Sequence, residues 1–120
     1  MKLHMSQNTS ITLIRHGETE WNLCGRWQGH ADSPLSPRGV AQAEALGQRM
    51  KGEQFDFYYS SDLGRAMHTS ELVGGPSGMI AEQYEELRER DLGVLEGMNT
   101  GEMKESQPDV YSSFRNDGPD

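Results

Sequence analysis

The sequence has little cysteine and no long apolar run, and each absence excludes a class of protein. A single cysteine, Cys24, excludes internal disulfides and cysteine-rich metal sites. No apolar run approaches the roughly 20 residues that a membrane-spanning helix needs. The first residues include a lysine but no apolar stretch behind it, so no signal peptide is expected there. We therefore expect a cytoplasmic protein without a membrane partner.

Positive charge is also scarce. The 120 residues contain 11 Lys and Arg against 19 Asp and Glu, which gives a net charge of −8. A protein that binds nucleic acid needs a cationic face for the phosphate backbone, so no nucleic-acid partner is expected. Most of the acidic excess lies in residues 81–120, and we interpret it as a solvated face.

Branched and aromatic apolar residues are few, because Leu, Ile, Val and Phe together number 20 of 120. A fraction near one fifth, combined with high net charge, begins to indicate disorder. Residues 10–92 nevertheless have the patterns of well-formed strands and helices. We infer that residues 10–120 are the N-terminal part of one domain whose most apolar strands are missing. Residues 1–9 are expected to be a disordered tail or a cloning scar.

Strand and helix patterns alternate along the chain. Apolar and β-branched residues predict a strand over 10–15, alternation predicts a second one over 55–59, and a weaker pattern predicts a third over 79–87. Three- and four-residue spacing predicts two helices. The first follows Ser36-Pro37 and ends at Gly52; the second follows the caps at 60–62 and stops at 74–76. This order predicts an α/β domain with parallel strands.

Polar residues that can bind an anion follow the predicted strands, at the edge where parallel sheets bind ligands. Arg15 and His16 follow the first strand, Arg65 follows the second and Glu89 follows the third. Two guanidinium forks beside an imidazole concentrate positive charge, which favours a phosphate as the partner. A ring nitrogen of His16 can attack phosphorus, and Glu89 can donate a proton to the leaving oxygen. Gly17 would allow close backbone approach, and Asn22 could donate a further hydrogen bond.

Three blocks of sequence resemble a known family. Residues 13–22 read LIRHGETEWN and continue as GRWQGHADSPLS over 25–36; residues 59–66 read YSSDLGRA; LRE at 87–89 precedes GVLEG at 93–97. In this order the blocks resemble the signature of the histidine phosphatase superfamily, the phosphoglycerate mutase-like proteins, over residues 10–118 or so. The resemblance implies a three-layer α/β/α sandwich with a mainly parallel sheet, here incomplete at the C-terminus.

The same resemblance implies roles for particular residues. His16 would carry a phosphohistidine intermediate and Glu89 would be the acid, with no metal or other cofactor. The residues implied to hold the phosphoryl group or the substrate are Arg15, Arg65, Asn22, Gly17, Gln28, Gly29 and Arg90. Family members continue to a second catalytic histidine that is not found here. His30 and His68 are better interpreted as ordinary polar residues.

Two enzymatic reactions and one non-enzymatic function fit these residues. Mutases of the family follow the acid with arginine and then tyrosine two residues on; here Arg90 follows Glu89, but Leu92 stands where tyrosine would be. We therefore favour a phosphomonoesterase acting on small phosphorylated metabolites over a phosphoglycerate mutase. The missing histidine leaves a non-catalytic phosphate-binding or interaction fragment as the third hypothesis. We also expect this chain to be nearly inactive alone and to associate with another copy or with the rest of its domain.

Overall fold

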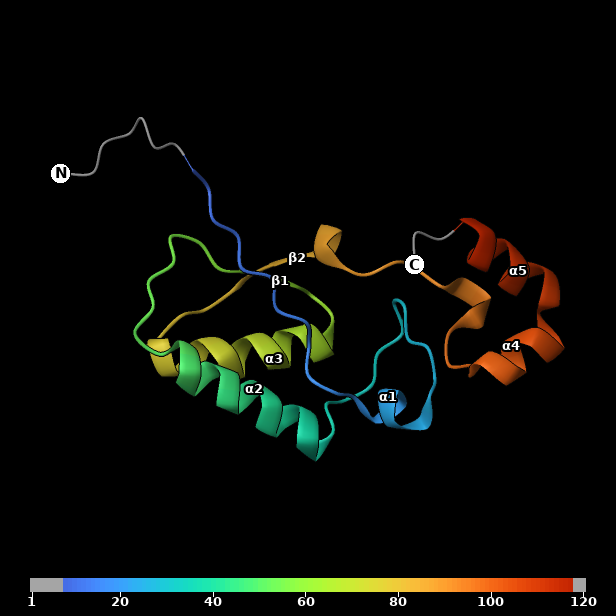
Figure 1. Cartoon of the computed structure of the whole chain (residues 1–120), viewed down its shortest axis with the longest axis horizontal. Coiled ribbons are helices and arrows are strands. Elements are labelled where there is room, and N and C mark those ends of the chain that lie inside the picture. The colour runs from blue at the N-terminus through green and yellow to red at the C-terminus, as the bar shows by residue number, and fades with distance from the viewer. Residues whose placement is uncertain (1–7, 118–120) are drawn as a thin grey trace.

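Helices alternate with two short parallel strands in the computed structural model of the chain, which describes residues 8–117. The elements in chain order are α1 (Glu20–Cys24), α2 (Pro37–Met50), β1 (Tyr59–Ser61), α3 (Gly64–Gly74), β2 (Glu82–Tyr84), α4 (Thr100–Ser106) and α5 (Pro108–Asp117). Single 3₁₀ turns occupy Gly75–Ser77, Glu85–Leu87 and Gly93–Leu95. Figure 1 shows β1 and β2 beside the α2–α3 pair, with α4 and α5 at the other end of the molecule.

Helix α2 forms where the sequence predicts it. The Ser36 hydroxyl accepts a hydrogen bond from the Gly39 amide at 3.1 Å, and Pro37 occupies the first turn. Beyond the last turn, Gly52 has a φ of 92°, a conformation that favours glycine. The helix buries Gly39, Ala43 and Gly47, and a Cβ on Gly47 would lie 2.5 Å from the carbonyl oxygen of Leu72 in α3. Small side chains therefore set the close approach of the two helices.

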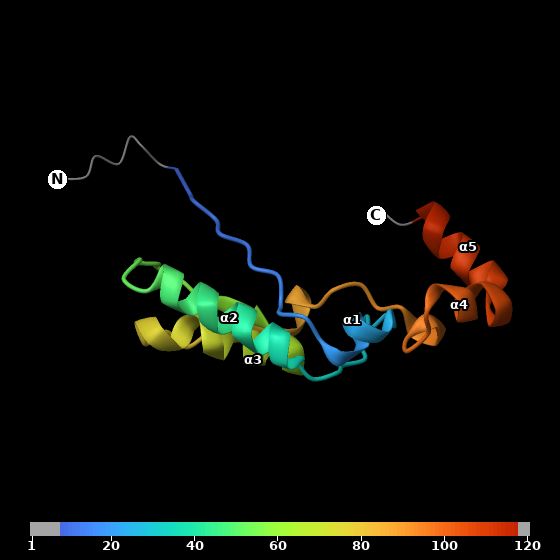
Figure 2. The same ribbon diagram turned by 60° about the horizontal axis from the view of Figure 1, so that its bottom comes forward.

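The sheet consists of β1 and β2, which pair in parallel with Tyr59 opposite Glu82 and Ser61 opposite Tyr84. Helix α3 is the crossover between them and contacts β1, and α2 packs on α3 (Figure 2). The predicted α/β class with parallel strands is confirmed. Strand β2 is a short part of the predicted range 79–87, whereas β1 overlaps the predicted range 55–59 only at Tyr59, because a ladder forms only where both partners align.

Two local predictions were wrong. Residues 10–15 are extended but have no ladder partner among the described residues, and Leu13 is 90% exposed. A strand needs a neighbour for its N–H and C=O groups, which the local sequence cannot supply. At the second helix, Leu63 occupies the N-cap without a side-chain hydrogen bond, and the Ser61 hydroxyl accepts the Leu63 amide instead. Of the expected tail, residues 1–7 lie outside the described residues.

Few apolar side chains are buried. Those that are fully shielded are Leu35, Ala43, Val73, Leu95 and Met103. The last two lie toward α4 and α5, so the small core is divided between the two ends of the molecule. No helix within residues 8–117 is long and apolar enough to cross a bilayer.

Candidate active site

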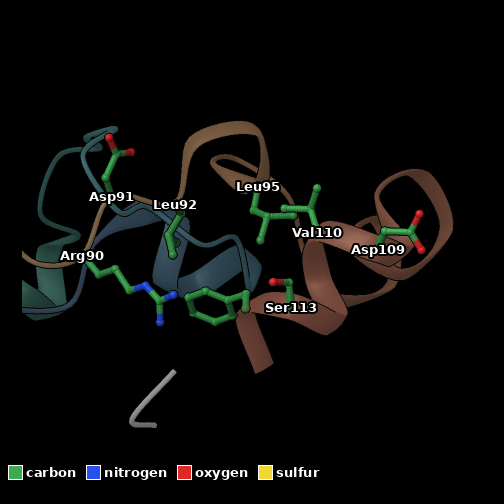
Figure 3. Close-up of a pocket in the computed structure, with 8 residues that line it drawn as sticks. Arg90, Asp91, Leu92, Leu95, Asp109, Val110 and Ser113 are labelled. Carbon is green, nitrogen blue, oxygen red and sulfur yellow. The ribbon is translucent and has the colours of Figure 1, made fainter. Parts of the chain in front are cut away.

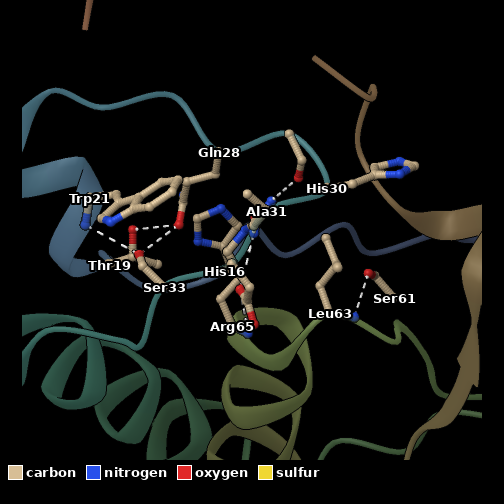
Figure 4. A network of polar contacts seen from close by, with 12 residues as sticks. His16, Thr19, Trp21, Gln28, His30, Ala31, Ser33, Ser61, Leu63 and Arg65 are labelled. Carbon is tan, nitrogen blue, oxygen red and sulfur yellow. Dashed lines mark hydrogen bonds and ion pairs between the residues drawn. The ribbon is translucent and has the colours of Figure 1, made fainter. Parts of the chain in front are cut away.

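Arg65, in the first turn of α3, is the centre of the polar network. It is only 2% exposed. Its Nη1 donates to the carbonyl oxygen of Ala31 at 2.6 Å and to Oδ1 of Asp32 at 3.1 Å, and Nη2 donates to the carbonyl of Gly29 at 2.6 Å. One guanidinium therefore holds the 29–32 loop against the start of α3 (Figure 4).

The carboxylate of Glu89 joins Arg65 from a distant segment. Oε1 of Glu89 lies 3.2 Å from Nη2 of Arg65 and accepts a hydrogen bond from the Gly29 amide at 3.0 Å. About half of the Glu89 side chain stays exposed to solvent. This carboxylate is thus fixed at one oxygen and accessible from outside, which suits a group that exchanges protons with a ligand.

His16 is connected to the same helix through its neighbour. The Gly17 amide donates to the Thr69 hydroxyl at 3.0 Å, and that hydroxyl donates to the carbonyl oxygen of Arg65 at 2.7 Å. Nδ1 of His16 lies 2.7 Å from the Gly17 carbonyl oxygen. Because a carbonyl oxygen only accepts hydrogen bonds, Nδ1 is the donor in this contact. Nε2 of the half-buried imidazole is therefore the ring nitrogen that can act as a nucleophile.

Packing requires glycine at position 17, in addition to the predicted close approach of the backbone to a phosphate. A Cβ at this position would lie 2.5 Å from the carbonyl oxygen of Gly39, at the start of α2. The loop after residue 15 and the N-terminus of α2 therefore touch through two glycines. This contact fixes where the His16 backbone stands.

Asn22 and Gln28 hold the loop around α1. Oδ1 of Asn22 accepts the Thr19 amide at 2.9 Å in a capping box. Oε1 of the buried Gln28 accepts hydrogen bonds from the hydroxyls of Thr19 at 3.1 Å and Ser33 at 2.8 Å. Within residues 8–117 the Nδ2 amide of Asn22 has no hydrogen-bond partner, so its donors remain open to a ligand.

Two of the predicted site residues lie apart from this network. Arg15 is exposed and precedes His16 on the extended segment. The guanidinium of Arg90 stands over the ring of Phe114, 4.4 Å from its centroid. Arg90 lines a hollow between the 90–95 segment and α5, of about 420 Å³ (Figure 3). The structure therefore brings Arg90 to α5 rather than to Arg65.

A bidentate ion pair fixes the segment that leads into Glu89. Nε and Nη2 of Arg88 donate to the two carboxylate oxygens of Asp62, at 2.6 and 2.7 Å. This hydrogen bonding by Arg88 holds the pKa of Asp62 below its usual value. The pair joins the loop before α3 to the residue next to Glu89.

Sequence reasoning missed several residues that support the network, among them Asp32, Thr69 and the pair His30 and Glu96. The His30 amide donates to Oε2 of Glu96 at 2.8 Å, and Nε2 of His30 lies 2.9 Å from the Glu89 carbonyl oxygen. Glu96 is part of the GVLEG block, so the resemblance contained a signal that was not used. The described residues contain no cluster of three or more side chains suited to a metal ion.

Comparisons with known proteins agree on the family. The model of the histidine phosphatase superfamily (branch 1) matches residues 11–120. A Proteus mirabilis protein named "Probable phosphoglycerate mutase GpmB" is 44% identical over 86 residues, which are 72% of this chain and 40% of its own length. The metal-independent phosphoserine phosphatase of Arabidopsis thaliana is 41% identical over 112 residues, 91% of this chain and 47% of its own length.

A solved structure shows the same fold. The α-ribazole phosphatase of Shigella flexneri superposes with a TM-score of 0.80 and 36% identity, over 87% of this chain and 52% of that one. The chain thus spans about half the length of the relatives it matches. Sequence, structure and family model agree, and the chain belongs to the histidine phosphatase superfamily.

Proposed function

We propose that this chain carries the nucleophile and the acid of a phosphomonoesterase that acts on small phosphorylated metabolites. The observation that supports it most is the connection through Thr69, which attaches the His16–Gly17 loop to the turn of α3 that bears Arg65. Glu89 is bonded to the same guanidinium. The nucleophile, the phosphate-binding cation and the carboxyl group are thus all connected to the first turn of α3.

The reaction has two steps. Nε2 of His16 attacks phosphorus while the bond from phosphorus to the ester oxygen breaks, and the leaving oxygen takes a proton from Glu89. Water then attacks the phosphohistidine, gives its proton back to Glu89 and releases inorganic phosphate. Nδ1 of His16, bonded to the Gly17 carbonyl, keeps the ring oriented throughout.

The phosphoryl oxygens need cationic and amide donors. Arg65 and the exposed Arg15 would supply charge, and the open Nδ2 of Asn22 would add a hydrogen bond. Gln28 and Gly29 would form the wall beside the substrate, because both lie in the loop that Arg65 holds. Gln28 would act mainly by keeping that loop in place, since its carbonyl oxygen already accepts two hydroxyl groups.

Hydrolysis is favoured over mutase chemistry by the residues after Glu89. Arg90, at the position where mutases of the family also have arginine, stands over the ring of Phe114. Leu92 has no hydroxyl and packs against Gly29, where an added Cβ would lie 2.8 Å from the Leu92 side chain. Relatives carry the names of both activities, a phosphoserine phosphatase and a phosphoglycerate mutase. We therefore propose water rather than a sugar acid as the acceptor.

The test is to trap the intermediate. A form of the protein extended to the length of its relatives is mixed with a panel of ³²P-labelled phosphomonoesters that includes phosphoserine, and the label on the protein is measured after quenching. We expect label that is lost in acid and retained in base, as for a phosphohistidine, and that is absent from His16→Ala. His68→Ala, at an exposed position on α3, is the matched control and should keep the label.

Three outcomes would contradict the proposal. Label that survives acid but is lost in base would indicate a serine or threonine ester. Equal labelling of His16→Ala and the wild-type chain would exclude His16 as the acceptor. Phosphate binding without any covalent label or turnover would favour the non-catalytic phosphate-binding function.

A further inference from the structure

One turn of the chain, Gly29–His30, contacts both the side chain and the main chain of Glu89. Its carboxylate accepts the Gly29 amide at 3.0 Å, and its carbonyl oxygen lies 2.9 Å from Nε2 of His30. A carbonyl only accepts, so Nε2 of His30 is the donor. The position of the Glu89 side chain therefore depends on where the Gly29–His30 turn stands.

That turn is held in place by Glu96 as well as by Arg65, which donates to the Gly29 carbonyl oxygen. Oε2 of Glu96 accepts the His30 amide at 2.8 Å and also the Leu92 amide at 3.4 Å. One carboxylate oxygen thus joins the turn to the segment that follows Glu89. Gly29, with a φ of 59°, lies against this carboxylate, and an added Cβ would come within 2.7 Å of Oε2.

Two main-chain hydrogen bonds adjoin the contact. The Trp27 amide donates to the Met98 carbonyl at 3.0 Å, and the Gly97 amide donates to the Trp27 carbonyl at 2.8 Å. These bonds hold the two segments together at residue 27. Glu96 adds a further contact between the two segments, at the amides of His30 and Leu92.

We propose that Glu96 is a positioning residue that sets the place of the Glu89 carboxylate through the Gly29–His30 turn. The inference rests on the proposed function, in which Glu89 donates the proton to the leaving oxygen. Glu96 is bonded to the main-chain amides of His30 and Leu92, and its carboxylate also contacts the side chain of Asp91. A proton donor must lie within about 3 Å of the leaving oxygen, and a displacement of about 1 Å can cost on the order of 10²-fold in rate.

In this role Glu96 needs an acceptor oxygen rather than a charge. Substitutions by glutamine and by alanine should therefore have different effects. Glu96→Gln keeps an amide oxygen for the His30 N–H, whereas Glu96→Ala leaves that N–H and the Leu92 N–H without their acceptor. Glu44→Ala, at an exposed position on α2, is the matched control. Thermal unfolding of each variant confirms that it is folded before kinetics are compared.

Turnover is measured on a form of the protein extended to the length of its relatives, because we expect the 120 residues alone to be nearly inactive. The first readout is kcat/KM for an alkyl phosphate such as phosphoserine against 4-nitrophenyl phosphate, whose leaving group needs no proton. Glu96→Ala should lose on the order of 10²-fold with the alkyl phosphate and much less with the aryl phosphate. Glu96→Gln should stay close to the wild-type protein with both. Equal losses with both substrates, or equal losses in the Ala and Gln variants, would overturn the inference.

The second readout needs no turnover. Hydrogen exchange at the amides of Gly29 and His30 should become about tenfold faster in Glu96→Ala and stay slow in Glu96→Gln and Glu44→Ala. Unchanged exchange in Glu96→Ala would overturn the inference. A Glu89→Gln variant that is equally active on both leaving groups would instead overturn the acid role in the proposed function. The two failures are thus distinguishable.

Discussion

Arg65 shows why one residue type is required at the centre of the site. Its fork reaches two carbonyl oxygens and the carboxylate of Asp32 in one plane, and it also contacts Glu89. A lysine carries the same charge as a point on a flexible stem and cannot reproduce this planar set of donors. The single guanidinium therefore joins the 29–32 loop, α3 and the segment of Glu89.

A prediction at this scale concerns the Asp62–Arg88 pair. Arg88 lowers the pKa of Asp62, so the pair stabilises the folded chain above the unfolded pKa of Asp62, near 4. That stability is lost as the pH falls through the lower pKa of the folded state. Asp62→Asn should therefore lower Tm at neutral pH, and the difference from the wild-type chain should disappear as the solution becomes strongly acidic.

The measurement is a series of thermal unfolding curves between acidic and neutral pH. Asp56→Asn, at an exposed position before β1, is the control and should follow the wild-type curve. A Tm difference for Asp62→Asn that is the same at every pH would show that the lost interaction is not the ion pair.

At the scale of elements, the sequence predicts structure well where the signals are local. The bounds of α2 follow from the Ser36 cap, the proline after it and Gly52, all within a few residues of the helix ends. The strands depend on partners far along the chain, so their lengths could not be predicted. Residues 10–15 have a strand's composition and no ladder partner in the described part of the chain.

The candidate site, like the fold, could be predicted from the sequence only in part. His16, Arg65 and Glu89 could be proposed because they lie in recognisable blocks. The acceptors that Arg65 uses and the bond from His30 to Glu96, 66 residues apart, are set by how the loops fold on each other. Arg90 was expected at the substrate, but Phe114 offers its aromatic ring nearby, and the sequence gives no sign of that contact.

A prediction for the α2–α3 pair uses two glycines. Alanine at Gly47 would place a Cβ 2.5 Å from the Leu72 carbonyl oxygen and force the helices apart. We expect a loss of about 1–3 kcal/mol from overpacking, offset by about 1 kcal/mol of helix propensity. Gly75 has a φ of −52° and a ψ of −51° directly before Pro76, where a Cβ would crowd the proline ring, so Gly75→Ala should also destabilise the chain, through local backbone strain.

Urea denaturation measures both changes. The midpoint should fall for both variants at an unchanged slope. A midpoint that does not fall for Gly47→Ala would show that α2 and α3 are not in close contact at Gly47.

The whole molecule is open. Its radius of gyration is 17.4 Å, whereas a compact domain of 100 residues has one of about 13 Å. Large apolar side chains lie on the surface along the extended segment and beside the sheet, with Ile11 75% and Phe57 71% exposed. The segment also carries main-chain N–H and C=O groups without ladder partners among the described residues. Such a surface favours association.

We therefore predict that the isolated chain self-associates. Light scattering should give a mass above 13.4 kDa that increases with concentration. Replacing Ile11 and Leu13 by serine should lower the mass toward the monomer. Leu23→Ser is the control, because Leu23 is also exposed but lies on α1 with its backbone bonded. A monomer at every concentration would show that these side chains do not drive association.

The occupied fork of Arg65 has a consequence for selectivity. Its Nη atoms are already bonded to carbonyl oxygens and carboxylates, so an incoming oxyanion that reaches them must displace an acceptor. Binding there is an exchange of partners, in which the affinity reflects the difference between the new acceptor and the old one. A weakly basic monoanion gains little from such an exchange, whereas a phosphate dianion gains more. The same contacts that hold the loop thus discriminate among anions.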